Sequence, residues 1–215
     1  MKKTFCIIFL IGMTVTNLVY GQFPASYGVK AGLSIANQSW KFTNLDYTLE
    51  TDPLYSASVA LFMEAFKGEH FSFQFDAAYE LKGSSTSVQS ITVQHFNNDQ
   101  ITVNAGALST SSFKYLSFSP MARYRFDLEN LVPYFLLGPR IDMLLSYTSD
   151  SENPLESWRG YAVGLTIGAG MEYSFGQFNL FTEIQYQPDL SPLTNHEPLL
   201  INNNMLVITL GVRTW

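Results

Sequence analysis

Three histidines are the side chains of this chain best suited to acid–base chemistry near neutral pH, namely His70, His95 and His196. Acyl transfer or hydrolysis on a lipid would need such a base beside a nucleophile and an oxyanion donor. One candidate pairs His95 with Ser90 or Ser109. Another pairs His196 with Asp189. All of these lie in expected loops, where histidines are usually solvated, so we predict no catalytic residues and a protein that is not an enzyme.

Metal and cofactor chemistry have less support still. The scattered histidines supply no ligand spacing. The single cysteine, Cys6, lies in the apolar run near the N-terminus, so no disulfide is expected. We predict neither a metal nor a cofactor.

The N-terminal segment has the pattern of a secretory signal. Lys2 and Lys3 precede an apolar run that extends to Val19, and Gly21 offers a small residue for cleavage. A membrane anchor is the alternative, but the run is short for a span of about 20 apolar residues. We therefore predict a signal peptide over residues 1–21 and one mature domain over residues 22–215.

Charged side chains recur at alternate positions, which is the spacing of one face of a strand. Residues 71–82 carry aromatic and aliphatic groups on one face and Gln74, Asp76, Glu80 and Lys82 on the other. The same pattern places eight strands near 26–39, 55–66, 71–82, 113–126, 133–147, 158–173, 178–188 and 204–215. The fold class predicted is all-β, an eight-stranded antiparallel transmembrane β-barrel of the outer membrane with its apolar face toward lipid.

Connection lengths give the expected orientation. Short connections at 67–70, 127–132 and 174–177 predict periplasmic turns, and longer ones at 40–54, 83–112, 148–157 and 189–203 predict extracellular loops. Both termini are then expected in the periplasm of a Gram-negative bacterium. The Ser/Thr-rich stretch over 83–112 is expected to be a mobile loop.

A set of twelve charged side chains falls on the predicted inner face. Its six cations and six anions are Lys30, Glu64, Asp76, Glu80, Lys82, Arg123, Arg125, Arg140, Asp142, Glu172, Glu183 and Arg213. A register slip of one residue would turn these side chains toward lipid, at a free-energy cost of about 2 to 4 kcal/mol for each Arg or Lys near the midplane. The lumen of eight strands can be filled by side chains, so a charge-paired plug is favoured over a narrow pore, which stays the alternative.

Composition fits this reading. Losing Lys2 and Lys3 leaves 10 basic against 18 acidic residues and changes the formal charge from −6 to −8, which argues against a nucleic-acid partner. Aromatic residues, at 15%, outnumber charged ones, at 14%, as suits a wall ringed by aromatic girdles.

Prolines and glycines inside the strands need an explanation. Pro120 and Pro139 are expected opposite each other on the lipid face, with a local bulge or kink. The alternating glycines of residues 164–170 are expected to make room for bulky neighbours such as Arg140 or Phe181.

Several segments together resemble the small outer-membrane β-barrel proteins labelled porin family or PorT-like. They are residues 27–33, 115–120, 138–139, 164–170 and 208–215. The resemblance implies an eight-stranded barrel of the OmpA/OmpX type. It also implies that some relatives assist protein secretion, while most have no assigned chemistry.

The outer wall predicts contacts with lipid. Lys114 and Arg159 occupy lipid-facing positions near the outer strand ends, where they could meet lipopolysaccharide phosphates or extend into water. Lipid-facing aromatics are expected to form girdles at both interfaces: Tyr27, Tyr55, Phe71, Tyr79, Phe126, Phe135, Tyr147, Tyr161, Tyr173, Phe178 and Tyr186.

The function predicted is a structural or interactive one in the outer membrane: envelope integrity, loop-mediated binding, or support of a secretion or assembly complex. A narrow pore is the second hypothesis and a lipid-modifying barrel enzyme the third. Expected partners are outer-membrane lipid and lipopolysaccharide, the barrel assembly machinery during biogenesis, and an envelope or secretion protein.

Overall fold

The computed structural model describes residues 25–42, 47–87, 91–94, 100–103, 108–126, 128, 131–149, 158–193 and 199–214. The signal peptide predicted over residues 1–21 lies outside these ranges and stays a prediction. Within the described ranges, no helix is long and apolar enough to cross a membrane.

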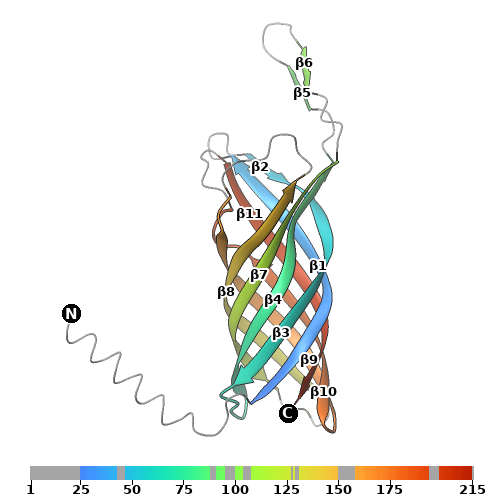
Figure 1. Cartoon of the computed structure of the whole chain (residues 1–215), viewed down its shortest axis with the longest axis vertical. Coiled ribbons are helices and arrows are strands. Elements are labelled where there is room, and N and C mark those ends of the chain that lie inside the picture. Colours follow the sequence, from blue (N-terminus) through green and yellow to red (C-terminus); the bar gives the residue numbers. More distant parts are fainter. Residues whose placement is uncertain are drawn as a thin grey trace, which may run out of the picture.

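Eight long antiparallel strands form a closed barrel (Figure 1). They are β1 (Ser26–Phe42), β3 (Asp52–Ala65), β4 (Phe71–Ser87), β7 (Leu108–Arg125), β8 (Leu131–Ser149), β9 (Tyr161–Phe175), β10 (Phe178–Pro188) and β11 (Leu199–Thr214). Neighbours along the chain pair with one another, and β11 closes the barrel by pairing with β1 from Gly28 opposite Arg213 to Phe42 opposite Leu199. The predicted fold class is confirmed.

Three short strands lie in segments that were predicted to be loops. They are β2 (Tyr47–Glu50), β5 (Ile91–Gln94) and β6 (Gln100–Val103). β2 pairs with the end of β1, whereas β5 and β6 form a separate two-stranded sheet, which Figure 1 shows beyond the barrel. Isoleucine, threonine and valine fill both β5 and β6, and β-branched residues favour strands. The prediction of a loop over all of 83–112 is therefore wrong for these residues. It is also wrong for the ends of β4 and β7, which stay paired up to Ser87 and Leu108.

The two ends of the barrel differ in their connections. Short ones join β3 to β4, β7 to β8 and β9 to β10 at one end, called the turn end here. Gly176 has a φ of 67° in the two-residue turn between Phe175 and Phe178, a conformation that glycine adopts at little cost. The longer connections lie at the other end, called the loop end. The predicted alternation of short and long connections is thus confirmed.

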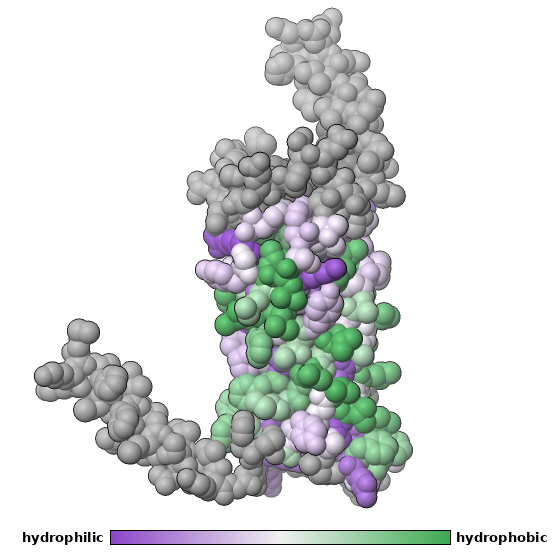
Figure 2. Space-filling view, in the orientation of Figure 1, coloured by the Kyte–Doolittle hydropathy of each residue, from purple (hydrophilic) through white to green (hydrophobic). Residues whose placement is uncertain are grey.

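The two faces of each strand have opposite character. Along β10, Ile184 and Tyr186 are exposed while Glu183 and Gln185 are buried in the lumen. Figure 2 shows the result on one side of the molecule: apolar side chains cover most of the wall, and hydrophilic ones gather toward its ends. The wall thus suits a lipid environment and the lumen an aqueous or ion-paired one.

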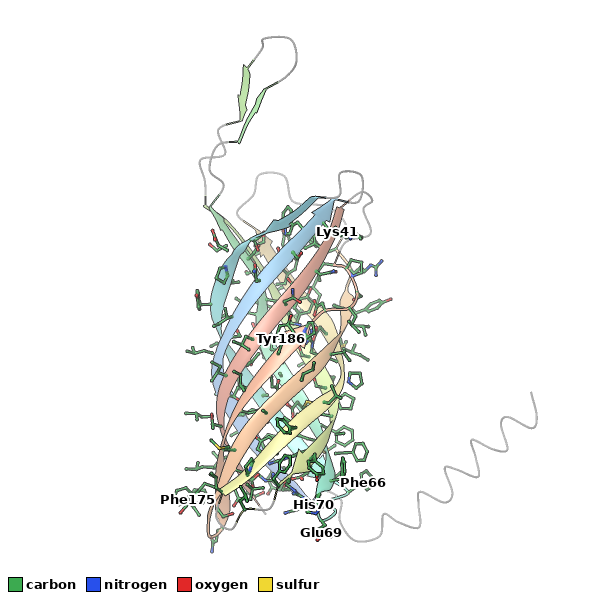
Figure 3. All side chains as sticks on the ribbon, turned by 180° about the vertical axis from the view of Figure 1, so that it is seen from behind. Lys41, Phe66, Glu69, His70, Phe175 and Tyr186 are labelled. Atoms are coloured by element: carbon green, nitrogen blue, oxygen red, sulfur yellow. The ribbon has the colours of Figure 1, made fainter. Side chains whose placement is uncertain are left out.

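Aromatic side chains gather on the outer wall as expected. Ten of the eleven aromatics predicted to face lipid are exposed: Tyr27, Tyr55, Phe71, Tyr79, Phe126, Phe135, Tyr161, Tyr173, Phe178 and Tyr186. At the turn end their rings touch in series: the centroid of Tyr124 lies 4.8 Å from that of Phe71 and 4.9 Å from that of Phe126. Figure 3 shows Phe66 and Phe175 at the same end. These rings form an interfacial girdle.

The proline pair lies as predicted, but the bulge does not. Paired positions stop at Phe118 with Ile141 and resume at Ala122 with Leu137. Both strands have three residues in between, so Pro120 and Pro139 face each other without an extra residue.

The register shift of this hairpin lies instead beyond Tyr115, toward the loop end. Lys114 pairs with Ser146 and Tyr115 with Leu144, so Leu145 is the extra residue. The shift turns Tyr147 inward, where its ring packs 4.7 Å from that of Phe113. The prediction that Tyr147 faces lipid is therefore wrong.

Glycines leave space for large side chains in the lumen. A Cβ on Gly164 would lie 2.6 Å from Arg140 Nη2, so the expected accommodation of Arg140 is confirmed. Phe181 is accommodated by Gly211, where a Cβ would lie 2.2 Å from its ring. The Phe181 ring in turn meets Phe62 edge to face, with centroids 5.3 Å apart. Glycines thus lie beside large side chains in the lumen and leave space for them.

Substituting Gly211→Ala should therefore destabilise the barrel, because the new methyl group overlaps Phe181 and cannot be accommodated without moving it. We expect a loss of about 1 to 3 kcal/mol in the free energy of unfolding, measured by urea titration of tryptophan fluorescence in lipid vesicles. Gly160→Ala is the matched control, since nothing lies within 4 Å of a Cβ at that position. Equal stability of the two variants would contradict this packing.

Candidate functional site

The lumen holds the densest group of functional side chains in the described structure. All twelve charged residues assigned to the inner face from the sequence lie there, none more than 6% exposed. They fall into three clusters along the barrel axis, which we name turn-end, middle and loop-end.

The turn-end cluster comprises Glu64, Glu172, Arg123, Arg125 and Arg213. Glu64 bonds to Arg213 and lies 3.1 Å from Arg125 Nη1. Glu172 lies 2.5 Å from Arg123 Nη2 and 2.9 Å from Arg213 Nη1. Three guanidinium groups thus share two carboxylates, which leaves an excess positive charge.

The turn between β3 and β4 covers this cluster. Arg125 Nη2 donates to the carbonyl oxygen of Gly68 at 2.8 Å. Burial lowers the pKa of the neighbouring Lys67, and the Arg213 and Arg125 charges lower it further. The carboxylates of Glu64 and Glu172 act in the opposite direction and raise the pKa of Lys67.

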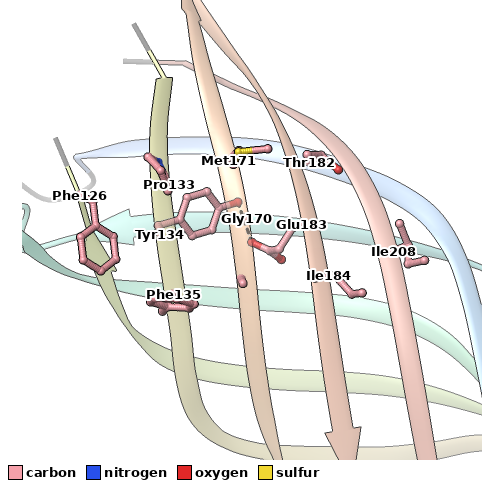
Figure 4. Close-up of a pocket in the computed structure, with 11 residues that line it drawn as sticks. Phe126, Pro133, Tyr134, Phe135, Gly170, Met171, Thr182, Glu183, Ile184 and Ile208 are labelled. Carbon is pink, nitrogen blue, oxygen red and sulfur yellow. Dashed lines mark hydrogen bonds between the residues drawn. The ribbon is translucent and has the colours of Figure 1, made fainter. Parts of the chain in front are cut away.

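The middle cluster comprises Lys30, Asp76, Glu183 and Tyr134. Lys30 Nζ lies 2.5 Å from a carboxylate oxygen of both Asp76 and Glu183. The Tyr134 hydroxyl donates to Glu183 at 3.0 Å, as Figure 4 shows. This position of Tyr134 requires glycine at residue 170, where a Cβ would lie 2.3 Å from the ring. One ammonium and one hydroxyl therefore satisfy two carboxylates from different strands.

The loop-end cluster comprises Lys82, Arg140, Asp142, Glu80 and Asp189. Lys82 Nζ lies 2.5 Å from Asp142, and Arg140 Nε lies 3.0 Å from the same carboxylate. Arg140 also bonds to Asp189. Glu80 accepts a hydrogen bond of 2.9 Å from Ser117.

Asp189 is a lumen residue that the sequence analysis placed in a loop. It directly follows Pro188, the last residue of the strand predicted over 178–188. The alternation Glu183, Gln185, Gln187, Asp189 continues past that proline, and this was the signal that could have identified it. With Asp189 included, the charged residues assigned to the lumen in the described ranges are six cations and seven anions.

Glutamines join the three clusters into one network. Gln74 accepts a 3.4 Å bond from Arg123 and donates a 2.9 Å bond to Asp76, so it links the turn-end and middle clusters. Gln185 donates to Glu183 at 2.7 Å. Gln187 donates to Gln185 at 2.9 Å and accepts from Arg140 at 3.2 Å. Polar contacts therefore run from the turn end to the loop end without a break.

An apolar cap lies beyond the loop-end cluster. Its buried members are Phe113, Tyr115, Ala162, Leu193 and Ile201, with Trp40, Leu144, Tyr147 and Trp158 packed against them. The Lys82 ammonium lies 5.4 Å from the centre of the Tyr115 ring, which marks the contact between cap and cluster. The Trp158 ring lies 4.7 Å from that of Phe113. The loop end of the lumen is thus packed with apolar side chains.

A groove of about 370 Å³ lies on the wall around β9 and β10 (Figure 4). Exposed apolar residues such as Phe135, Met171 and Ile184 form its sides. Its one carboxylate, Glu183, is already bonded to Lys30 and Tyr134. The groove therefore presents an apolar surface to lipid.

The proposed catalytic pairs are not assembled by the described residues. His70 lies at the turn end (Figure 3), with its ring 5.9 Å from that of Tyr124. His95, His196 and Ser90, and the side chain of Ser109, lie outside the described part of the chain. Asp189, the partner considered for His196, is bound by Arg140. In the described ranges, no group of three or more His, Cys, Asp or Glu side chains could hold a metal ion.

The two predicted lipid-contact cations lie on either side of β8 near the loop end. Lys114 stands between Phe113 and Tyr115, which both point inward, so it points outward. Arg159 directly follows Trp158, a member of the apolar cap.

Comparison with known proteins agrees with this architecture. Residues 21–195 match the family model described as outer membrane protein beta-barrel domain. Neisserial surface protein A has a similar solved structure, with 15% identity, a TM-score of 0.52 and coverage of 87% of this chain and 96% of that one. No curated protein matches this chain.

Two further solved structures are more distant in shape. Ail, the attachment invasion locus protein of Yersinia pestis, is 12% identical, with a TM-score of 0.39 over 87% of this chain and 97% of that one. The outer membrane protease OmpT of Escherichia coli is 8% identical, with a TM-score of 0.42 over 88% and 95%. At such low sequence identities, structural similarity indicates a shared fold and not a shared function, which has to be argued from the site.

Removing a shared carboxylate should cost more than removing an exposed one. Glu64→Leu removes a carboxylate that pairs with all three guanidinium groups of the turn-end cluster, so we expect a loss of about 3 to 5 kcal/mol in the free energy of unfolding. Glu69→Gln, in the exposed turn at the same end, should change it by less than about 0.5 kcal/mol. Urea titrations of both variants in lipid vesicles provide the measurement, and similar losses would show that the network adds no stability.

Proposed function

Because residues 21–195 match its family model, the chain belongs to the outer membrane protein beta-barrel domain family and is a small β-barrel of the Gram-negative outer membrane. We propose that it acts there as a non-enzymatic, non-conducting scaffold. Its role is then structural or interactive. The observation that carries this proposal is the network that crosses the lumen from wall to wall.

The crossing contacts explain why the scaffold would not conduct. Gln187 of β10 donates to Glu80 of β4 at 3.1 Å, and Gln185 of β10 donates to Asp76 of β4 at 3.4 Å. In the closed order of strands, β4 and β10 lie on opposite sides of the barrel. A solute would have to separate such pairs and leave desolvated charges behind, which costs several kcal/mol for each ion. Beyond them it would meet the apolar cap. A lumen of this kind fits a closed, charge-paired plug better than a narrow pore.

The scaffold would display its loop end to the outside. Bacterial barrels of this class have short periplasmic turns and longer extracellular loops. The turn end and both termini then face the periplasm, and the β5–β6 sheet faces outward. An envelope or secretion protein is the proposed class of partner, with the barrel assembly machinery as a transient one during biogenesis.

Conductance tests the closed lumen. Purified protein reconstituted in planar bilayers should give no steady single-channel current, because the network spans the lumen. Reconstitution is checked in the same sample by protease protection and heat-dependent gel mobility. Steady, uniform current steps from the wild-type protein would favour the narrow pore instead.

Shortening one loop tests the interactive role. Ser87 and Leu108 are paired in register, so an Asn-Gly turn can replace residues 88–107 without disturbing β4 or β7. We expect this variant to keep its unfolding midpoint in urea and to lose its crosslinks to other envelope proteins in intact cells. A variant with the same turn inserted in place of Gly176 and Gln177 is the control. Unchanged crosslinks in the loop variant would argue against recognition through β5 and β6.

A further inference from the structure

We propose that the wall around β8 at the loop end binds the phosphorylated headgroup of lipid A, the membrane anchor of lipopolysaccharide, with Lys114 and Arg159 as its two anchoring cations. The inference rests on the orientation in the proposed function, in which the loop end lies in the outer leaflet. It adds a lipid ligand, and it assigns a role to the bulge in β8.

The strand register brings the two cations to opposite edges of the same strand. Lys114 pairs with Ser146 of β8. On the other side Met143 pairs with Tyr161, and Leu144 N donates to the Gly160 carbonyl at 2.9 Å. Continuing that register by two residues places Arg159 beside Leu145. The backbones of Lys114 and Arg159 are therefore two strand spacings apart, which is about 10 Å.

The bulge places a surface that is both apolar and polar between Lys114 and Arg159. Because Leu145 is an extra residue, it and Ser146 both point outward instead of alternating. Leu145 is 56% exposed. The surface between the cations thus presents an apolar side chain and a hydroxyl. An amphiphile that carries both acyl chains and anionic oxygens fits this combination.

The site lies at the border of the apolar wall. On the side toward the turn end, Ile141, Met143 and Tyr161 are exposed on β8 and β9. On the other side, β8 continues with the exposed Thr148. A lipid whose chains lie along the apolar residues has its phosphates at the level of the two cations. Arginine can bind a phosphate through two parallel hydrogen bonds, and lysine adds a point charge.

Lipid A suits the spacing better than a phospholipid does. Its headgroup is a wide disaccharide with several acyl chains, whereas a phospholipid carries one phosphate over two chains. Cations about two strand spacings apart match the wider headgroup. Lys41 offers a contrast: it is exposed near the loop end (Figure 3) but stands on β1, across the barrel from β8.

The test measures binding of lipid A to the full-length barrel in phosphatidylcholine vesicles. Three ligands are titrated: lipid A with two phosphates, the same lipid with its phosphates removed, and phosphatidylglycerol. The variants are Lys114→Ala with Arg159→Ala, the charge-preserving Lys114→Arg with Arg159→Lys, and Lys41→Ala as the matched control. Gel mobility and circular dichroism confirm that each variant is folded.

We expect the double alanine variant to bind phosphorylated lipid A at least tenfold more weakly than the wild type, and the other two variants to stay within about threefold. Phosphate-free lipid A should bind the wild type as weakly as the double alanine variant binds the intact ligand. Equal binding by wild type and double alanine variant would overturn the proposal, as would equal affinity for phosphatidylglycerol, which would indicate a general attraction for anionic lipid.

The orientation of the barrel is tested separately, so that a wrong orientation can be distinguished from a failure of the lipid A site itself. The variant Thr148→Cys should react with a membrane-impermeant maleimide on intact cells. Absence of labelling, with labelling restored after the outer membrane is permeabilised, would overturn the orientation and with it both proposals. Conductance in planar bilayers does not depend on Lys114 or Arg159, so a conducting barrel that still binds lipid A would refute only the closed scaffold.

Discussion

Pairing of buried charges across the lumen is the constraint on which the rest of this barrel depends. An ionised group taken out of water costs several kcal/mol unless an opposite charge and hydrogen bonds replace its hydration. In the turn-end cluster, Arg213 meets two carboxylates that come from β3 and β9. Because each contact joins strands that are not hydrogen-bonded neighbours, the strands must adopt one register for all of them to form at once.

The same constraint explains which features the sequence could predict. A strand with one face in lipid and one in a polar lumen alternates strictly, so β-strands and their inner charged residues were readable from period two alone. The closed barrel follows from an even number of such strands. Pro120 and Pro139 could be matched because both strands have the same number of residues from their shared turn.

Features that depend on more than the alternation of residues could not be predicted from the sequence. The extra residue Leu145 reverses the phase of β8 toward the loop end, and Tyr147 therefore packs on Phe113 and not on lipid. Asp189 was missed because the strand predicted over 178–188 ends one residue before it. The glutamines that join the clusters were missed because an uncharged amide in the lumen looks like any polar residue, and its partners depend on which strands lie across the barrel.

Closure through β11 and β1 has a consequence for how the barrel forms. β11 supplies both the partner of β1 and the guanidinium that Glu64 and Glu172 share. Without β11 in place, β1 and β10 each have an open edge, and the two carboxylates lack this guanidinium. The β11–β1 seam thus couples closure of the wall to neutralisation of the interior.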